Sequence, residues 1–326
     1  MSDYILVAIP LFILVAQILL AGGVGRDLFA VGDVWLRHLP GGLAVAAIFS
    51  CAVFAAISGS SVATAATVGL VAIPEMTRRG YPRRLVLGAL AAGGTLGILI
   101  PPSIPMILYG SITQQSIGAL FSAGILPGIL LTGLFAAYAS FAVGRQVSRE
   151  PSASWEERFG ALRKAFWGLL TPVIIVGGLY AGIFTPTESA AVGVVYSLII
   201  TMLIYRSITW RDLPDILLKT VKDSTMILMI IVGALLFGRV LTVLRVPQEI
   251  TALVTSQEMS KWLVLVAIIV LLTIMGMFLE VASVLLITIP ILFPIISALG
   301  FDPIWFAVVF VIVMEMALIT PPVGLN

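Results

Sequence analysis

Long apolar segments alternate with short polar loops over almost the whole chain. The apolar runs fall at about 4–22, 40–56, 62–75, 85–112, 117–143, 166–184, 187–205, 224–244, 262–279, 281–298 and 303–320. A helix needs about 20 apolar residues to cross a bilayer, so the longer runs predict membrane-spanning helices. The shorter runs, notably 62–75, predict arms of re-entrant helical hairpins. The pattern as a whole predicts an all-α integral membrane protein.

One arrangement of turn residues occurs twice. The first copy comprises Pro74, Gly80, Tyr81 and Pro101–Pro102. The second copy lies 220 positions later and comprises Pro294, Gly300, Phe301 and Pro321–Pro322. Each proline pair closes an apolar stretch and breaks the helix there, because proline lacks the backbone donor and clashes with the preceding turn. Paired helix breaks in a duplicated membrane chain predict a transporter with its binding site near the bilayer midplane.

Basic residues gather in a few loops and predict the orientation. Fifteen of the 18 lysines and arginines lie in the loops 23–39, 76–84, 145–165 and 206–223. These loops should be cytoplasmic, since positive charge accumulates on that side of a membrane. The segment 40–75 then leaves the cytoplasm and returns to it as a hairpin with a polar tip. The equivalent hairpin at about 262–294 has arginine-poor flanks and should open to the opposite face, so we expect inverted repeats that support alternating access.

The repeat divides the chain into two units and a connector. We expect the first repeat at 1–145, with its hairpin at about 40–75 and its broken helix at about 85–112. A cytoplasmic amphipathic connector follows at 146–165. The second repeat covers 166–326, with its hairpin at about 262–294 and its broken helix at about 303–326. When the two halves are aligned by the 220-residue offset, some apolar elements of each half have no partner in the other. We therefore expect that an N-terminal and a C-terminal segment of a longer protein are absent.

Composition excludes several classes of function. Only 10% of the residues are charged and 60% are hydrophobic, with a mean hydropathy of +1.16, whereas soluble domains are about 25% charged. The single Cys51 excludes an internal disulfide, and the single His38 excludes a histidine-rich metal centre. The chain has no GxxxxGK[ST] phosphate loop, no HExxH pair, and no histidine near Ser58 or Ser60 to act as a base. We therefore expect no enzyme, no direct ATP drive and no nucleic-acid partner, with the lipid bilayer as the environment.

Four segments resemble a known family of transporters. They are SGSSVATAATVGLVAIPEMTRRGY (58–81), AAGGTLGILIPPSIPMILYG (91–110), GIFTPTESAAVG (182–193) and ITPPVGLN (319–326). Together they resemble the large membrane (permease) subunit of TRAP transporters, the tripartite ATP-independent periplasmic family, over essentially the whole chain. The chain departs from the family at two points. The family's terminal helices are absent, and Glu280–Val281 stands where the family commonly has Asp–Pro.

The resemblance implies a function and a set of partners. It implies a sodium-coupled importer of a small organic acid in the bacterial inner membrane, with Na⁺ as the coupling ion and no other cofactor. The implied partners are a small four-helix membrane subunit and a periplasmic binding protein that delivers the substrate. The implied fold has two re-entrant hairpins and two broken helices in a mobile domain that moves as an elevator. Sialic acids, dicarboxylates, keto acids and sugar acids all fit as substrates. A stand-alone sodium–dicarboxylate symporter and a purely structural scaffold are the alternatives.

Candidate sodium ligands lie at the hairpin tips and helix breaks. Sodium prefers oxygen ligands, which hydroxyls and unwound backbone carbonyls supply. The first set is Ser58, Gly59, Ser60, Gly94, Thr95 and Gly97. The inverted repeat predicts a second set, Gly276, Glu280, Thr320, Pro321, Gly324 and Asn326. Helix packing explains an isolated serine or glycine better than a ligand role does, but packing does not explain paired helix breaks.

An anionic substrate requires positive potential. Ser61 and Ser103 lie at predicted helix N-termini, whose partial positive charge attracts carboxylates. Arg239 is the one arginine well inside an apolar run, where an unpaired charge costs about 3 kcal/mol, and it is a candidate carboxylate clamp. A snorkelling arginine at the interface, or a structural partner of Glu280, explains Arg239 equally well.

Overall fold

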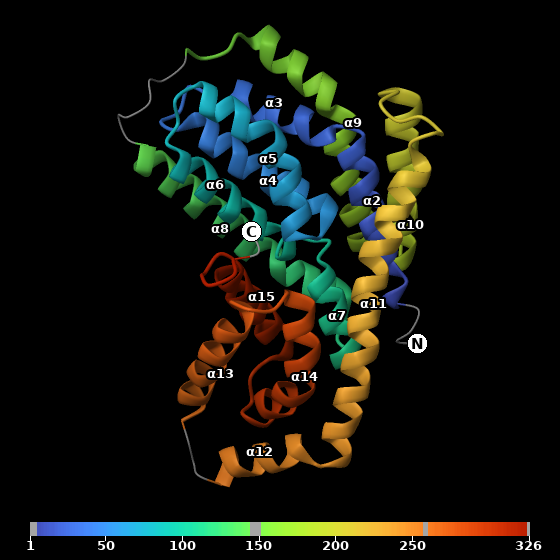
Figure 1. Ribbon diagram of the computed structural model, residues 1–326, viewed down its shortest axis with the longest axis vertical. Helices are drawn as coiled ribbons and strands as arrows, with labels where there is room; N and C mark the ends of the chain where they lie inside the picture. The colour runs from blue at the N-terminus through green and yellow to red at the C-terminus, as the bar shows by residue number, and fades with distance from the viewer. Residues whose placement is uncertain (1–4, 144–150, 257–259, 325–326) are drawn as a thin grey trace.

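The computed structural model describes residues 5–143, 151–256 and 260–324, and it is helical without strands over these ranges (Figure 1). Five segments of the described chain are long and apolar enough to cross a membrane. They are α8 (Ile117–Val143), α9 (Trp155–Tyr180), α10 (Pro186–Leu198) with its π-helical extension η2 (Ile199–Ile204), α11 (Leu213–Val243) and α14 (Val281–Ala298). A sixth would be α2 (Ala8–Ala21) together with α3 (Val24–Leu36), which meet at 67°. The predicted class, an all-α membrane protein, is confirmed.

The first hairpin consists of two helices that meet at a two-residue tip. Helix α4 (Gly42–Ser58) ends at Gly59, whose φ of +62° lies in the left-handed region that glycine adopts without strain. Helix α5 (Ser61–Arg78) starts directly afterwards, with Ser60 as its N-cap accepting a hydrogen bond from the Ala63 amide. The tip therefore lies within the predicted hairpin at 40–75, and its glycine and serine residues agree with the predicted polar tip. Whether the hairpin is re-entrant stays a prediction.

The first broken helix follows immediately. Helix α6 (Arg83–Thr95) passes into a single 3₁₀ turn, η1 (Leu96–Ile98), and the chain resumes as α7 (Ile104–Thr113). Pro101–Pro102, joined by a cis bond, lies in the gap. Ser103 secures the restart, because its hydroxyl donates to the Ile98 carbonyl and accepts from the Met106 amide. The break thus has its own hydrogen bonds, as non-helical backbone away from water requires.

The second half contains comparable elements and one helix that the hydrophobic pattern does not predict. After α11, the short α12 (Val246–Ser256) precedes α13 (Lys261–Gly276), and α14 begins after Glu280. Helix α15 (Pro303–Leu318) follows and ends before the second proline pair, which is also joined by a cis bond. The described chain closes with a turn that reaches Gly324. The inverted relation between the two halves stays a prediction.

The predicted connector is continuous with the next helix. Helix α9 starts at a capping box formed by Ser154 and Glu157 and runs without interruption to Tyr180. The predicted boundary between 165 and 166 therefore falls inside one helix, because α-helical hydrogen bonding continues from the amphipathic first turns into the apolar span. Residues 146–150 of the predicted connector lie outside the described residues.

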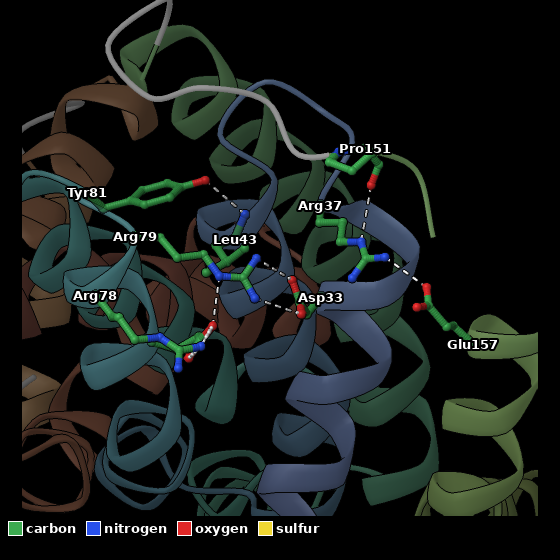
Figure 2. A network of polar contacts seen from close by, with 9 residues as sticks. Asp33, Arg37, Leu43, Arg78, Arg79, Tyr81, Pro151 and Glu157 are labelled. Carbon is green, nitrogen blue, oxygen red and sulfur yellow. Dashed lines mark hydrogen bonds and ion pairs between the residues drawn. The ribbon is translucent and has the colours of Figure 1, made fainter. Parts of the chain in front are cut away.

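Ion pairs join the basic loops to neighbouring helices (Figure 2). Arg79, at the end of α5, bonds Glu75 at 2.7 Å and Asp33 of α3 at 3.3 Å. Arg37, at the end of α3, bonds Glu157 of α9 at 2.8 Å. These side chains are partly exposed, so each pair contributes at most about 1 kcal/mol. Together the pairs link the end of α3 to the end of α5 and to the start of α9.

Helix α11 runs along one side of the molecule, beside α2 at one end and α12 and α14 at the other (Figure 1). Helices α2 to α6 form a group around the first hairpin, and α12 to α15 form a second group. Helix α7 packs against α14, which brings the first break to the second hairpin. This contact positions the candidate site.

Candidate functional site

The two hairpin tips and the first helix break line one small cavity of about 70 Å³. The first tip contributes Gly59 to Val62, the break contributes Ile98, Ile104 and Pro105, and the second tip contributes Glu280 to Ala282. Leu318, the last residue of α15, and Ile227 of α11 complete the lining. Segments separated by more than 200 positions therefore meet at one point.

The first predicted sodium set lies at close backbone contacts between the tip and the break. A Cβ added to Gly59 would lie 2.7 Å from the Pro102 carbonyl oxygen, and the Ile104 amide donates to the Gly59 carbonyl at 3.4 Å. A Cβ on Gly97 would collide with the Ser60 carbonyl group and lie 2.8 Å from Thr64 Oγ1. One on Gly94 would lie 2.7 Å from the Ala65 Cβ. Glycine is needed at these positions because the break lies directly on the hairpin.

Hydroxyl and carbonyl oxygens converge at the first tip. The Ser58 hydroxyl is fully buried and lies 2.7 Å from Thr64 Oγ1, which donates to the Ser60 carbonyl at 2.7 Å. Thr95 of α6, 1% exposed, donates to the Ala92 carbonyl of its own helix and is not among the residues that line the small cavity. Each of these oxygens keeps a lone pair for a cation, and no lysine or arginine lines the cavity beside them. The donor set fits a hard cation such as sodium.

The second predicted set is spread more widely over the described residues. Glu280 caps α14, accepting hydrogen bonds from the Ala282 and Ser283 amides at 3.0 and 3.4 Å, and it lines the cavity. Gly276 lies against α15, where an added Cβ would be 2.6 Å from the Ala317 Cβ. Thr320 bonds back to the Met316 carbonyl at 2.6 Å. Pro321 and Gly324 lie in the turn after α15, and Asn326 lies outside the described residues.

Of the three predicted substrate residues, the structure brings Ser61 and Ser103 to the small cavity and places Arg239 away from it. Ser61 is the first residue of α5 and lines the small cavity, and Ser103 caps α7 beside it. Arg239 is exposed on α11 and is absent from the lining of every described cavity. The described ion pairs do not join it to Glu280, whose carboxylate instead bonds backbone amides.

A larger cavity of about 380 Å³ opens beside the small one and brings in residues that the sequence did not indicate. Its lining includes Ser58, Ser60 and Glu280 from the hairpin tips, together with Gln17 of α2 and Asp223 of α11. Gln17 Nε2 donates to Asp223 Oδ2 at 3.0 Å. The available signals were an amide, Gln17, inside the apolar run 4–22 and a carboxylate, Asp223, directly before the run 224–244. Hydropathy alone does not assign either residue to a site.

Comparison with known proteins identifies the family. A family model described as "Tripartite ATP-independent periplasmic transporter, DctM component" matches residues 1–326. The chain belongs to this DctM family. It is 46% identical, over 327 residues, to the C4-dicarboxylate TRAP transporter large permease protein DctM of Pseudomonas aeruginosa, covering 100% of this chain and 76% of the relative.

Two further DctM relatives carry other substrates in their names. The isethionate TRAP transporter permease protein DctMQ of Oleidesulfovibrio alaskensis is 39% identical over 332 residues, 100% of this chain and 52% of that protein. The ectoine/5-hydroxyectoine TRAP transporter large permease protein UehC of Ruegeria pomeroyi is 38% identical over 321 residues, 98% of this chain and 75% of that protein. The resemblance to TRAP large permease subunits is thus confirmed. These relatives are named as transporter permeases and not as enzymes.

Proposed function

We propose that this DctM-family chain is the large transmembrane subunit of a sodium-coupled TRAP transporter in the bacterial inner membrane. It imports a small organic acid that a periplasmic binding protein delivers. The observation that carries the proposal is the meeting of both hairpin tips and the first helix break around adjoining cavities. The relatives named for C4-dicarboxylates, isethionate and ectoine support an organic acid as the cargo.

Sodium binds, in this proposal, among the oxygens of the first tip and break. Ser58, Ser60 and Thr95 supply hydroxyls, and the turns at Gly59 and Gly97 supply carbonyls that no regular helix would leave available. The second set, with Glu280 at its centre, holds a further sodium ion. Bound sodium adds positive charge near the cavity, so sodium and an organic anion stabilise one another's binding.

The substrate carboxylate binds at the N-termini of α5 and α7. Ser61 and Ser103 place these helix ends at the first tip and the break, where both helix dipoles attract an anion and the amides of Ser61 and Val62 have no partner among the described contacts. Helix α11 belongs to the scaffold past which the hairpins move. Arg239 lies 16 residues after Asp223, about 24 Å along that helix. We therefore assign Arg239 a role in the conformation that the hairpins reach at the other end of their movement along α11.

Two protein partners belong to the proposal. The name DctMQ of the isethionate relative, about half of which this chain covers, supports a second membrane component that accompanies the DctM part. The binding protein determines which acid is delivered. The alternative, a stand-alone sodium–dicarboxylate symporter, needs neither partner.

Uptake into proteoliposomes separates these functions. The chain is reconstituted with a small TRAP membrane subunit from the same organism, and uptake of succinate and ectoine is followed with and without a sodium gradient and a periplasmic binding protein. Uptake that needs both the gradient and the binding protein is expected. Uptake at the full rate without the binding protein establishes the stand-alone symporter, and absence of uptake under all conditions rejects the transport proposal.

A further inference from the structure

The ionisable side chains that line the 380 Å³ cavity are both acidic. They are Asp223 and Glu280, and the rest of the described lining is apolar apart from Gln17 and two serines. A site for a dianion would be expected to present lysine or arginine to both carboxylates of its ligand. This cavity is instead lined by residues at the N-termini of α5 and α7 (Ser60, Val62 and Ile104) and by the carboxylates of Asp223 and Glu280.

Glu280 and Asp223 differ in how their charge is compensated. Glu280 is the N-cap of α14, and two backbone amides and the helix dipole offset its charge. Asp223 lies within α11, and its described hydrogen bond comes from the neutral amide of Gln17. Lys219, one turn earlier on α11, and the adjacent Lys222 are both exposed, and neither forms an ion pair with Asp223 among the described contacts. Asp223 therefore keeps its negative charge available to the cavity.

Gln17 also determines how Asp223 is held. Its Nε2 donates to Oδ2 at 3.0 Å and joins α2 to α11, so one carboxylate oxygen is fixed. The other oxygen, Oδ1, has no hydrogen-bond partner among the described residues. A free, oriented acceptor on the wall of a cavity suits a ligand that carries N–H donors, above all a cationic nitrogen group.

We propose that Asp223 is a specificity-determining residue that selects zwitterionic organic acids, binding their cationic nitrogen group. The inference rests on the proposed function and refines its substrate class. The ligand carboxylate binds at the N-termini of α5 and α7, and its cationic group reaches across the cavity to Asp223 Oδ1. A dicarboxylate in the same position places its second carboxylate against Asp223 and is repelled.

Binding to the full chain, reconstituted in nanodiscs with its small membrane subunit, tests this assignment. Ectoine serves as the zwitterionic probe and succinate as the dianionic probe, both titrated calorimetrically in sodium-containing buffer. Wild-type protein should bind ectoine at least ten times more tightly than succinate. Asp223→Asn should weaken ectoine binding at least ten-fold, leave succinate binding equal or tighter, and leave the sodium dependence of thermal stability unchanged.

The matched control is Asp215→Asn, which removes the same charge from an exposed position on α11 outside the cavity lining. It should change neither affinity. Equal losses for both probes in Asp223→Asn, or an altered sodium dependence, overturn the assignment, the latter because it makes Asp223 a sodium ligand. If Asp223→Asn does not fold, the wild-type preference between the two probes decides.

The outcomes also separate this inference from the proposed function. Tighter binding of succinate than of ectoine by wild-type protein rejects selection by Asp223 and leaves the organic-acid importer standing. Failure to bind either probe, combined with absence of uptake in proteoliposomes, rejects the transport function and the inference together.

Discussion

Replacing Gly97 with alanine tests the contact between the first hairpin tip and the broken helix. A Cβ at this position lies 2.7 Å from the Ser60 carbonyl carbon and 2.8 Å from Thr64 Oγ1, whereas ordinary contacts start at 3.4 Å. The Ser60 carbonyl oxygen is closer still, so the tip must move by more than about 0.7 Å. Gly97 does not have a positive φ, so the effect is steric and not a backbone restriction.

This displacement should weaken sodium binding. Overpacking a close contact costs about 1–3 kcal/mol. Ligand sites lose their geometry when atoms shift by more than about 0.5 Å, and the displaced groups include candidate sodium ligands on Ser60. We expect Gly97→Ala to raise the sodium concentration for half-maximal thermal stabilisation at least ten-fold, which corresponds to about 1.4 kcal/mol.

The assay is the melting temperature of the purified protein across a sodium series, with choline replacing sodium at constant ionic strength. Gly88→Ala is the matched control, because a Cβ there meets no atom within 4 Å and α6 gains up to about 1 kcal/mol of helix propensity. A Gly97→Ala protein with wild-type stability and wild-type sodium dependence refutes the reasoning, since it shows that the tip and break do not form the cation site.

Other substitutions address separate parts of the proposal. Ser60→Ala removes a candidate sodium ligand, and Ser103→Ala removes the hydroxyl that bonds Ile98 and Met106 across the break beside that site. Each also removes a helix cap, worth about 0.5–2 kcal/mol, and should abolish sodium-dependent stabilisation; full retention of that stabilisation counts against the first site. Arg239→Ala should abolish uptake while sodium-dependent stabilisation persists, with Arg245→Ala as a control, and wild-type uptake removes the role assigned to Arg239. Glu315→Met should keep or raise the melting temperature, because Glu315 is 3% exposed and its Oε1 has no partner among the described residues. A marked fall in melting temperature would mean that a bound cation or proton stabilises this carboxyl group.

Proline and glycine made much of the local structure predictable. Pro101–Pro102 and Pro321–Pro322 cannot continue a helix, and the structure describes α6 to η1 and α15 ending before them. Gly59 and Ser60 form a tip because glycine tolerates a left-handed residue and serine caps the next helix. These are effects of single residues on their immediate neighbours, so they can be read from the sequence.

Other features depended on packing. Helix α12 was missed because it is short and lacks a long apolar run, and the connector was separated from α9 because hydropathy changes within one continuous helix. The hydropathy pattern indicated Arg239 as a candidate carboxylate clamp because it is a charge inside an apolar run, but the structure places its side chain on the exposed surface of α11. Hydropathy records the composition of a segment and not the direction in which each side chain points.

The sequence by itself determined the membrane class, the family, the positions of the tips and breaks, and the residue types at the first candidate sodium site. Only the tertiary structure decided that Gln17 and Asp223, 206 residues apart, share a hydrogen bond and line one cavity together with residues of the hairpin tips. The physical reason is that breaks and caps arise from local backbone geometry, whereas the charge of a cavity arises from side chains that distant helices bring together.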